Sequence, residues 1–192
     1  MGKRTQRMDA AMRRLTLFIC LAALTVLAKP TEKLPLPKQL QGELPWFALD
    51  TKDGEKSYYG VLNNNKLKDI AKKRGSKRIV FSFFATWCVS CREGLALMSQ
   101  KAAELEKKGV LLVLVNMGEQ DFGKIDEWAK PFFKDEWFLS FDSFKNLSED
   151  FGLAGQGNEM PLPQTLILAP DLRPVMLLGD KGDDFLQILW SE

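Results

Sequence analysis

Two short runs of uncharged, strand-forming residues enclose an amphipathic stretch, and this arrangement restricts the fold more than any other feature of the sequence. The runs cover residues 79–84 and 110–115 and contain no charged side chain, which is typical of strands covered on both faces of a sheet. The stretch between them ends at Gly109, and its apolar residues recur at three- and four-residue steps: Leu95, Met98, Ala102 and Leu105. We therefore expect a helix between two parallel strands, joined by a right-handed crossover.

The rest of the chain continues this alternation. The patterns predict a helix over 121–133, a strand over 137–141, a short helical segment over 146–151, a hairpin of strands 165–168 and 174–178, and a short final helix over 183–190. A chain of 192 residues is long enough for one core of this kind. The expected fold class is α/β, with a central mixed sheet flanked by helices.

Basic residues precede an uncharged run at the N-terminus. Five Lys and Arg side chains are followed by residues 15–28, which carry no charge, and this is the layout of a secretory signal. As a helix the run would span about 21 Å, which is shorter than the roughly 30 Å hydrocarbon core of a membrane. We expect residues 1–28 to form a signal peptide or an N-terminal membrane anchor, and we favour the removable signal.

Residues 29–42 contain three prolines and show no periodicity, so we expect a linker there and a single folded domain over 43–192.

Histidine is absent from the whole sequence. This absence excludes His-based catalytic triads, haem ligation through His and metal sites that need imidazole. Residues 1–28 carry a net charge of +4 within a total of +2, so the remainder carries −2. This charge does not indicate a nucleic-acid partner, which would need a basic face on the folded domain. We therefore expect no metal, no cofactor and no nucleic-acid partner.

Two of the three cysteines, Cys88 and Cys91, form a C-x-x-C pair where the first strand meets the helix. Disulfide exchange needs one exposed, easily deprotonated thiol and a second thiol within reach. At the first turn of a helix, Cys88 faces unpaired backbone N–H groups that favour its thiolate, and Cys91 lies deeper on the same side. We expect Cys88 to attack and Cys91 to resolve. A structural zinc half-site lacks its remaining ligands, and a structural disulfide closing so short a loop contributes little stability.

The stretch Phe83-Phe-Ala-Thr-Trp-Cys-Val-Ser-Cys-Arg92 resembles the active-site segment of the TlpA/ResA/CcmG branch of the thioredoxin superfamily, the exported and often membrane-tethered thiol-disulfide oxidoreductases of bacteria. Residues 44–54 are similar to the family's opening hairpin, and residues 160–171 to its segment around a cis-proline. The resemblance covers most of the chain, and it implies a thioredoxin-like three-layer sandwich.

The resemblance also assigns three residues beside the cysteines. Pro163 matches the cis-proline that packs beside the disulfide, and Leu162 matches the residue whose backbone pairs with the bound partner. Trp87 matches the tryptophan that flanks the nucleophile. Without the resemblance, Pro163 would be an ordinary proline at the start of a strand and Trp87 a core aromatic. With it, we expect all three in the substrate-binding surface.

The sequence departs from the family pattern around the pair. The dipeptide between the cysteines is Val-Ser, where proline is common at the second position. Ser82 stands where thioredoxins place a buried acid, and Gly94 stands where the ResA-like branch has a glutamate. Glu93 is the nearest acid, but it lies about 100° around the helix from that position, so a solvated surface charge is its alternative role. The base that assists Cys91 is therefore left open.

These observations predict a thiol-disulfide oxidoreductase in the periplasm or on the outer face of the bacterial inner membrane. The resemblance implies that it reduces or exchanges disulfides of exported proteins, with electrons from a membrane thiol donor, in cytochrome c maturation or general thiol homeostasis. The membrane would be contacted only through an uncleaved N-terminal segment. Two alternatives are a disulfide-forming oxidase and a non-enzymatic binding or assembly module. A thiol peroxidase of this fold needs a threonine three residues before the reactive cysteine, whereas Thr86 stands two before Cys88.

Overall fold

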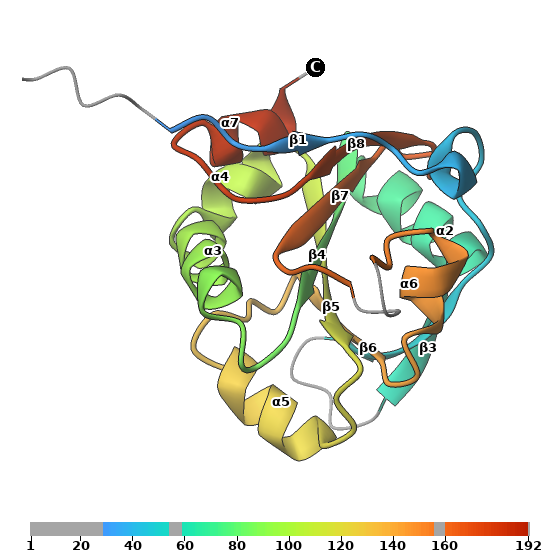
Figure 1. Ribbon diagram of the computed structural model, residues 1–192. Coiled ribbons are helices and arrows are strands. Elements are labelled where there is room, and N and C mark those ends of the chain that lie inside the picture. Colours follow the sequence, from blue (N-terminus) through green and yellow to red (C-terminus); the bar gives the residue numbers. More distant parts are fainter. Residues whose placement is uncertain (1–28, 54–58, 156–159, 192) are drawn as a thin grey trace, which may run out of the picture.

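The computed structural model describes residues 29–53, 59–155 and 160–191 (Figure 1). The expected signal or anchor over 1–28 lies outside the described residues, and so does Cys20. Among the described residues, no helix has the length and apolar character needed to span a membrane.

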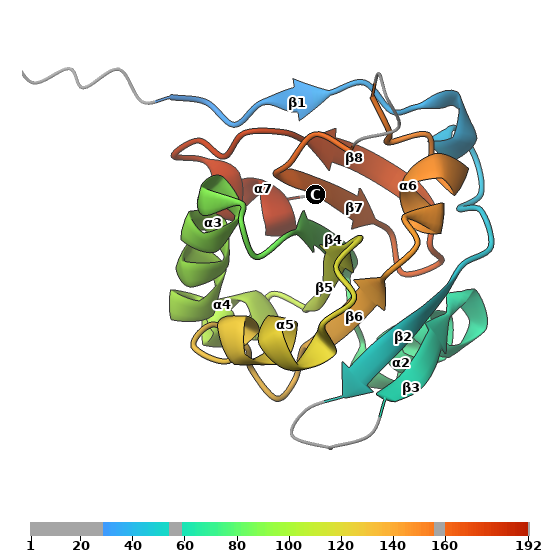
Figure 2. The same cartoon turned by 60° about the horizontal axis from the view of Figure 1, so that its bottom comes forward.

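One mixed sheet of eight strands organises the described part of the chain, in the order β1-β8-β7-β4-β5-β6-β2-β3 (Figures 1 and 2). The strands are β1 (Lys33–Leu34), β2 (Ala48–Asp53), β3 (Tyr59–Asn63), β4 (Arg78–Phe84), β5 (Val110–Met117), β6 (Phe138–Asp142), β7 (Gln164–Leu168) and β8 (Pro174–Leu178). The pairs β4–β5 and β5–β6 are parallel, and the other neighbours are antiparallel. The expected mixed sheet is confirmed.

Helices cover both faces of this sheet and produce the expected three layers. The helices are α2 (Asn64–Arg74), α3 (Val89–Gln100), α4 (Ala102–Lys107), α5 (Phe122–Ala129), α6 (Asn146–Asp150) and α7 (Phe185–Trp190). Side chains of α2 and α6 pack in one core with Phe81 and Phe83, whereas α3, α4, α5 and α7 pack in the other core with Val80 and Phe84. The two cores therefore lie on opposite faces of β4, as its alternating side chains require, and the views in Figures 1 and 2 show the two groups of helices on either side of the sheet.

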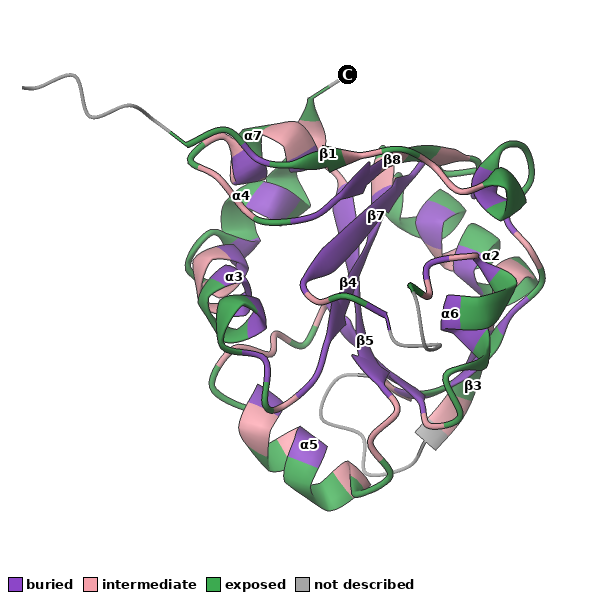
Figure 3. Ribbon diagram, viewed as in Figure 1, coloured by how far each residue is buried: buried purple, intermediate pink, exposed green. Residues whose placement is uncertain are grey.

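The central strands are covered on both faces, as their apolar runs predicted. All eight residues of β5 are buried, and so are six of the seven in β4 (Figure 3). A strand of this kind holds its C-terminal end rigidly, because every side chain along it is packed. The segment that carries the cysteines begins at that end of β4.

Two helical regions differ from the expectation. The single helix predicted before Gly109 is divided at Lys101, where the backbone amide bonds to Met98 instead of continuing the α-helical pattern. Helix α2 was not predicted, because only Leu67 and Ala71 of its residues are buried. Its ends do carry sequence signals: Asn63 caps the first turn through its side chain, and Gly75 ends the helix with a φ of 62°.

Residues 29–42, expected as a linker, pack against the domain in the structure. Strand β1 pairs with β8, and the Glu32 amide donates to Asp180 O at 2.9 Å. Leu40 is fully buried, and Thr31 is 5% exposed. The prolines in this segment do not oppose pairing, because an edge strand needs hydrogen bonds along one side only. The sheet therefore gains its outer strand from a segment whose sequence shows no strand periodicity.

Candidate active site

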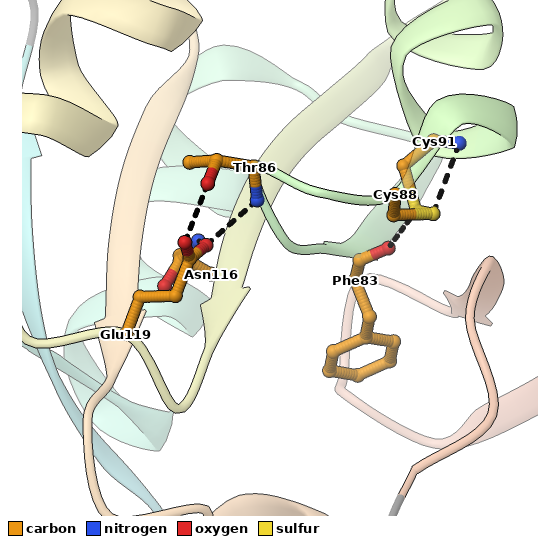
Figure 4. Close-up of a disulfide and its surroundings, with 6 residues drawn as sticks. All are labelled: Phe83, Thr86, Cys88, Cys91, Asn116 and Glu119. Carbon is orange, nitrogen blue, oxygen red and sulfur yellow. Dashed lines mark hydrogen bonds between the residues drawn. A yellow bond between two sulfur atoms is a disulfide. The ribbon is translucent and has the colours of Figure 1, made fainter.

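The turn between β4 and α3 holds the cysteine pair. Cys88 is the N-cap of α3, and its amide donates to Ala85 O at 3.1 Å. Cys88 and Cys91 form a disulfide with an S–S distance of 2.03 Å and a Cα–Cα distance of 5.3 Å. Figure 4 shows the pair at the start of the helix, beside the end of β4. The strand, turn and helix expected around the pair are therefore present.

The two sulfur atoms have different surroundings. Cys88 is 6% exposed and lies between two largely exposed residues, Trp87 at 70% and Val89 at 71%. Cys91 is 1% exposed and packs with Leu95 in the core beneath α3. A protein partner therefore reaches Cys88 first, and Cys91 lies behind it.

The backbone favours charge on Cys88 and opposes charge on Cys91. The Cys91 amide donates to Cys88 Sγ at 3.2 Å, and a donor of this kind at a helix N-terminus stabilises a thiolate. Cys91 Sγ instead lies 3.9 Å from Phe83 O, where a reduced sulfur would keep its proton and donate it to the carbonyl. The geometry supports Cys88 as the more acidic thiol of the reduced pair.

A row of uncharged residues crosses the sheet beneath α3. Ser82 is directly opposite Thr165 on β7 and Leu114 on β5, and all three are buried. Thr165 Oγ1 has no hydrogen-bond partner among the described residues. Ser82 therefore places a hydroxyl at the position where thioredoxins hold an acid, as the sequence indicated.

The Leu162–Pro163 peptide bond is cis, as the resemblance implied. Pro163 is buried and lines a groove together with Ser90. On the other side, Leu162 and Trp87 line a second hollow with Met160. The segment that carries the cis-proline therefore borders the start of α3 on two sides, and a role for these residues in binding a partner stays a prediction.

Glu119 is a site residue that the sequence analysis missed. Its carboxylate accepts hydrogen bonds from the Thr86 amide at 2.7 Å, from the Thr86 hydroxyl at 2.5 Å and from Asn116 Nδ2 at 2.7 Å (Figure 4). Asn116 lies on β5, which is parallel to β4, so both strands end at the same edge of the sheet. Polar residues at the carboxyl ends of parallel strands are the signal that could have identified Glu119.

Lys181 is a second site residue that the sequence patterns did not predict, and it lies against Gly94, the position where the ResA-like branch has a glutamate. Glu93 is exposed at the rim of the groove, whereas Gly94 is buried and contacts the side chain of Lys181. Burial lowers the pKa of Lys181 to about 8, and the charges of Asp180 and Glu93 partly oppose this shift. The amine therefore gains or loses its proton near pH 8, below the usual range of a lysine.

Comparisons with known proteins agree with this geometry. The sequence model of the AhpC/TSA family matches residues 41–173. No curated protein matches the chain.

Two solved structures that are similar to this chain are a putative thiol:disulfide interchange protein DsbE from Chlorobium tepidum and a secreted Mycobacterium tuberculosis disulfide oxidoreductase homologous to E. coli DsbE. The first has a TM-score of 0.52 at 19% identity, covering 80% of this chain and 86% of its own. The second has a TM-score of 0.54 at 16% identity, covering 79% and 96%.

A third similar structure is AhpC from Enterococcus faecalis. Its TM-score is 0.60 at 19% identity, and the match covers 78% of this chain and 88% of AhpC. At these identities the three structures establish a shared thioredoxin-like fold, and the chemistry has to be argued from the residues of this chain.

Proposed function

The chain belongs to the AhpC/TSA family as a thioredoxin-like thiol-disulfide oxidoreductase, and from this premise we propose that it reduces or exchanges disulfides of exported proteins through Cys88 and Cys91. One observation carries the proposal. Cys88 lies at the helix N-cap between two exposed residues and accepts a hydrogen bond from the Cys91 amide, while Cys91 is buried behind it. An outer, activated sulfur with a resolving sulfur in reach is the arrangement that exchange requires.

The reaction proceeds in two displacements. In the reduced protein, the Cys88 thiolate attacks one sulfur of the partner's disulfide, which forms a mixed disulfide and releases the first partner thiolate. The Cys91 thiolate then attacks Cys88 Sγ, and the second partner thiolate leaves with the electron pair. The partner gains two electrons, and the protein is left with the Cys88–Cys91 disulfide seen here. An external dithiol, which we propose to be a membrane thiol donor, returns the pair to the reduced state.

The partner is proposed to bind across the cis-proline segment. Trp87, the residue before Cys88, is 70% exposed and lines a hollow with Leu162. An exposed aromatic ring next to a reactive sulfur offers apolar contact area to a partner chain. The backbone of Leu162 would pair with an extended segment of that partner, and Pro163 would keep the segment close to the sulfur atoms.

The proposed location of the protein and the proposed direction of electron flow are supported by the N-terminal sequence, by a similar structure and by the family resemblance. The basic and apolar pattern of residues 1–28 favours export, and one of the similar structures is described as a secreted disulfide oxidoreductase. Reduction is favoured over oxidation by the resemblance to TlpA, ResA and CcmG. Cytochrome c maturation and general thiol homeostasis are the processes proposed on the same basis.

The first test is the reduction potential of the pair. Full-length protein with Cys20→Ser is equilibrated with mixtures of reduced and oxidised glutathione, and the fraction with free Cys88 and Cys91 is measured by alkylation. A reductant should lie near the potential of thioredoxin, about −270 mV, whereas an oxidase should lie near that of DsbA, about −120 mV. A value near the second figure would overturn the reductant assignment.

The second test identifies the partner and separates an enzyme from a binding module. Cys91→Ala should accumulate mixed disulfides through Cys88 in its own host, and Cys88→Ser should abolish both these adducts and disulfide reductase activity. If the reductase activity of the wild type does not exceed that of Cys88→Ser, and Cys91→Ala forms no adducts, the non-enzymatic binding or assembly module would be favoured.

A peroxidase role is disfavoured by one contact. The hydroxyl of Thr86, the only threonine close to Cys88 in sequence, donates to Glu119 Oε1 and is therefore not directed at the sulfur. Peroxide consumption by the reduced protein should not exceed that of Cys88→Ser, and a rapid thiol-dependent turnover of peroxide would contradict this.

A further inference from the structure

Lys181, in the loop between β8 and α7, lies against the helix that carries the cysteines. A Cβ built on Gly94 would lie 2.1 Å from Lys181 Cε and 2.3 Å from Nζ. Such distances do not occur between non-bonded atoms, so any larger residue at position 94 would displace the lysine. Gly94 therefore provides the space in which the amine is held.

This space is next to Cys91. Gly94 follows Cys91 by three residues, and both are buried on the inner face of α3. Residues three apart on a helix have their Cβ positions about 5–6 Å from each other, so Lys181 Nζ lies within about 8 Å of Cys91 Cβ. The same amine lines the groove of Ser90 and Pro163 and lies 5.3 Å from the centre of the Phe185 ring.

The amine is a cation without a close anionic partner. The charged groups that line its groove are Lys29, Glu93, Asp180 and Asp183. In the part of the chain that the structure describes, none of these carboxylates lies within 4 Å of Lys181 Nζ. Burial lowers the pKa of the amine to about 8, which leaves it mostly protonated at pH 7. A partly dehydrated cation of this kind interacts favourably with any negative charge that forms nearby.

The charge that forms nearby during exchange is the thiolate of Cys91. The buried strand position where thioredoxins hold an acid is occupied by the uncharged Ser82, and the Phe83 carbonyl favours the protonated sulfur of Cys91. We propose that the Lys181 ammonium stabilises the Cys91 thiolate and so promotes the second displacement, in which Cys91 attacks the mixed disulfide on Cys88. Lys181 acts through its charge and does not contact the reacting partner. The inference rests on the proposed function for its biological meaning, but its test needs no protein partner.

The test follows the resolving step directly. Reduced full-length protein with Cys20→Ser is mixed with one equivalent of dithionitrobenzoate in a stopped-flow instrument. Attack by Cys88 releases the first thionitrobenzoate and leaves the second bound through a mixed disulfide. Cys91 then attacks Cys88 Sγ, and the second thionitrobenzoate leaves with the electron pair. The pH dependence of this second release gives the apparent pKa of Cys91, because Cys91 is the one thiol left at the site.

Four variants separate the charge of Lys181 from its packing. Lys181→Met keeps the aliphatic chain and removes the charge, and Gly94→Ala keeps the charge and moves it away. The third variant combines both changes. Lys108→Met is the matched control, because Lys108 Nζ lies 6.0 Å from the Trp190 ring in a similar lysine–aromatic pair outside the groove.

We expect Lys181→Met to raise the apparent pKa of Cys91 by about one unit, the effect of two opposite charges about 8 Å apart in a partly buried site. The second release at pH 7 should slow about threefold to fivefold. A higher pKa lowers the fraction of Cys91 present as thiolate, and the greater nucleophilicity of a less acidic thiol offsets part of this loss. Gly94→Ala should shift the pKa in the same direction, the double variant should add nothing to Lys181→Met, and Lys108→Met should match the wild type.

The inference is overturned if Lys181→Met leaves the pH profile of the second release unchanged, or if Gly94→Ala slows the release equally with and without Lys181. These outcomes are independent of the proposed function. If Lys181→Met shifts the pKa of Cys91 but the protein reduces no protein disulfide, the role of Lys181 stands and the proposed function is wrong. If the protein reduces protein disulfides but Lys181→Met causes no shift, the proposed function stands and the role of Lys181 is wrong. Circular dichroism of each variant checks that it is folded.

Discussion

The carboxylate of Glu119 accepts two hydrogen bonds from Thr86, one from the backbone amide at 2.7 Å and one from the hydroxyl at 2.5 Å. This contact joins the loop after β5 to the turn that precedes Cys88. Because Asn116 Nδ2 donates to the same carboxylate, one side chain satisfies three donors at the carboxyl edge of two parallel strands. The turn that presents Trp87 and Cys88 is therefore fixed from the side opposite to α3.

Replacing Glu119 should loosen this turn. Glu119→Ala leaves the Thr86 amide and Asn116 Nδ2 without acceptors, and we expect the free energy of unfolding to fall by about 2 kcal/mol. Glu119→Gln should lose less, because it keeps one acceptor oxygen. Urea unfolding of the oxidised proteins measures the first effect, and hydrogen exchange of the Thr86 amide should be faster in Glu119→Ala.

An exposed glutamate gives the control for this prediction. Glu127 lies on α5 and is exposed, so Glu127→Ala should match the wild type in both measurements. If Glu119→Ala unfolds at the same urea concentration as Glu127→Ala, the contact with Thr86 contributes nothing to the turn.

The half-buried amine of Lys181 should make stability depend on pH in the alkaline range. Its pKa is about 8 in the folded protein against a usual 10.5, chiefly because of burial. Between these values the unfolded chain binds more protons than the folded one, so stability rises with pH. Burial of the amine therefore costs stability below about pH 8, and the cost disappears as the pH approaches 10.5.

Lys181→Met should remove this cost. We expect the melting temperature of the oxidised variant to exceed that of the wild type by about 2–5 °C at pH 7, and the difference to shrink at pH 10. Differential scanning calorimetry at the two pH values makes the comparison. A difference that is equal at both would mean that packing, and not the ionisation of Lys181, separates the two proteins.

Burial also destabilises the charged form of an acid, Asp142, and so makes stability depend on pH. Burial raises the pKa of this carboxyl, while hydrogen bonds from the backbone of Leu147, Asn146 and Ser148 act in the opposite direction. A raised pKa means that ionisation costs stability as the pH rises from 3.8 through the folded-state value. The carboxylate oxygen nevertheless stabilises the start of α6 as a hydrogen-bond acceptor, because Leu147 N donates to Asp142 Oδ2 at 3.0 Å.

Two substitutions separate the charge of Asp142 from its role as an acceptor. Asp142→Asn keeps an oxygen and removes the charge, so we expect stability at pH 7 to equal or exceed that of the wild type. Asp142→Ala removes the acceptor and should lose about 1 kcal/mol. Urea unfolding at pH 7 provides the comparison, and a larger loss in Asp142→Asn than in Asp142→Ala would contradict it.

The parts of the fold that the sequence predicted are those with a local signal. The runs that became β4 and β5 are apolar because both faces of these strands are covered. The turn with Cys88 and Cys91 follows directly from the strand and helix on its two sides. Helix α2 escaped because it buries few apolar residues, and its cap and its terminal glycine were the remaining signals.

The missed part of the site depends on contacts between residues far apart in the sequence. Glu119 meets Thr86 because β4 and β5 are parallel neighbours, and Lys181 meets Gly94 because the loop after β8 lies beside α3. The two positions that differ from the family pattern, Ser82 and Gly94, could be read from the sequence. The presence of Lys181 beside Gly94 could not be predicted, because this side chain comes from a loop with no sequence motif of its own.

Residues 29–42 give the last prediction. If this segment were a spacer, its removal would leave the domain unchanged, but Leu40 is fully buried and β1 extends the sheet beside β8. Relative to a chain that starts at residue 29, a chain that starts at residue 43 should therefore lose at least the roughly 2 kcal/mol gained by burying Leu40. Thermal unfolding of the two chains tests this. Equal melting temperatures would show that β1 and Leu40 add nothing to the domain, and that the segment behaves as the linker that its prolines suggest.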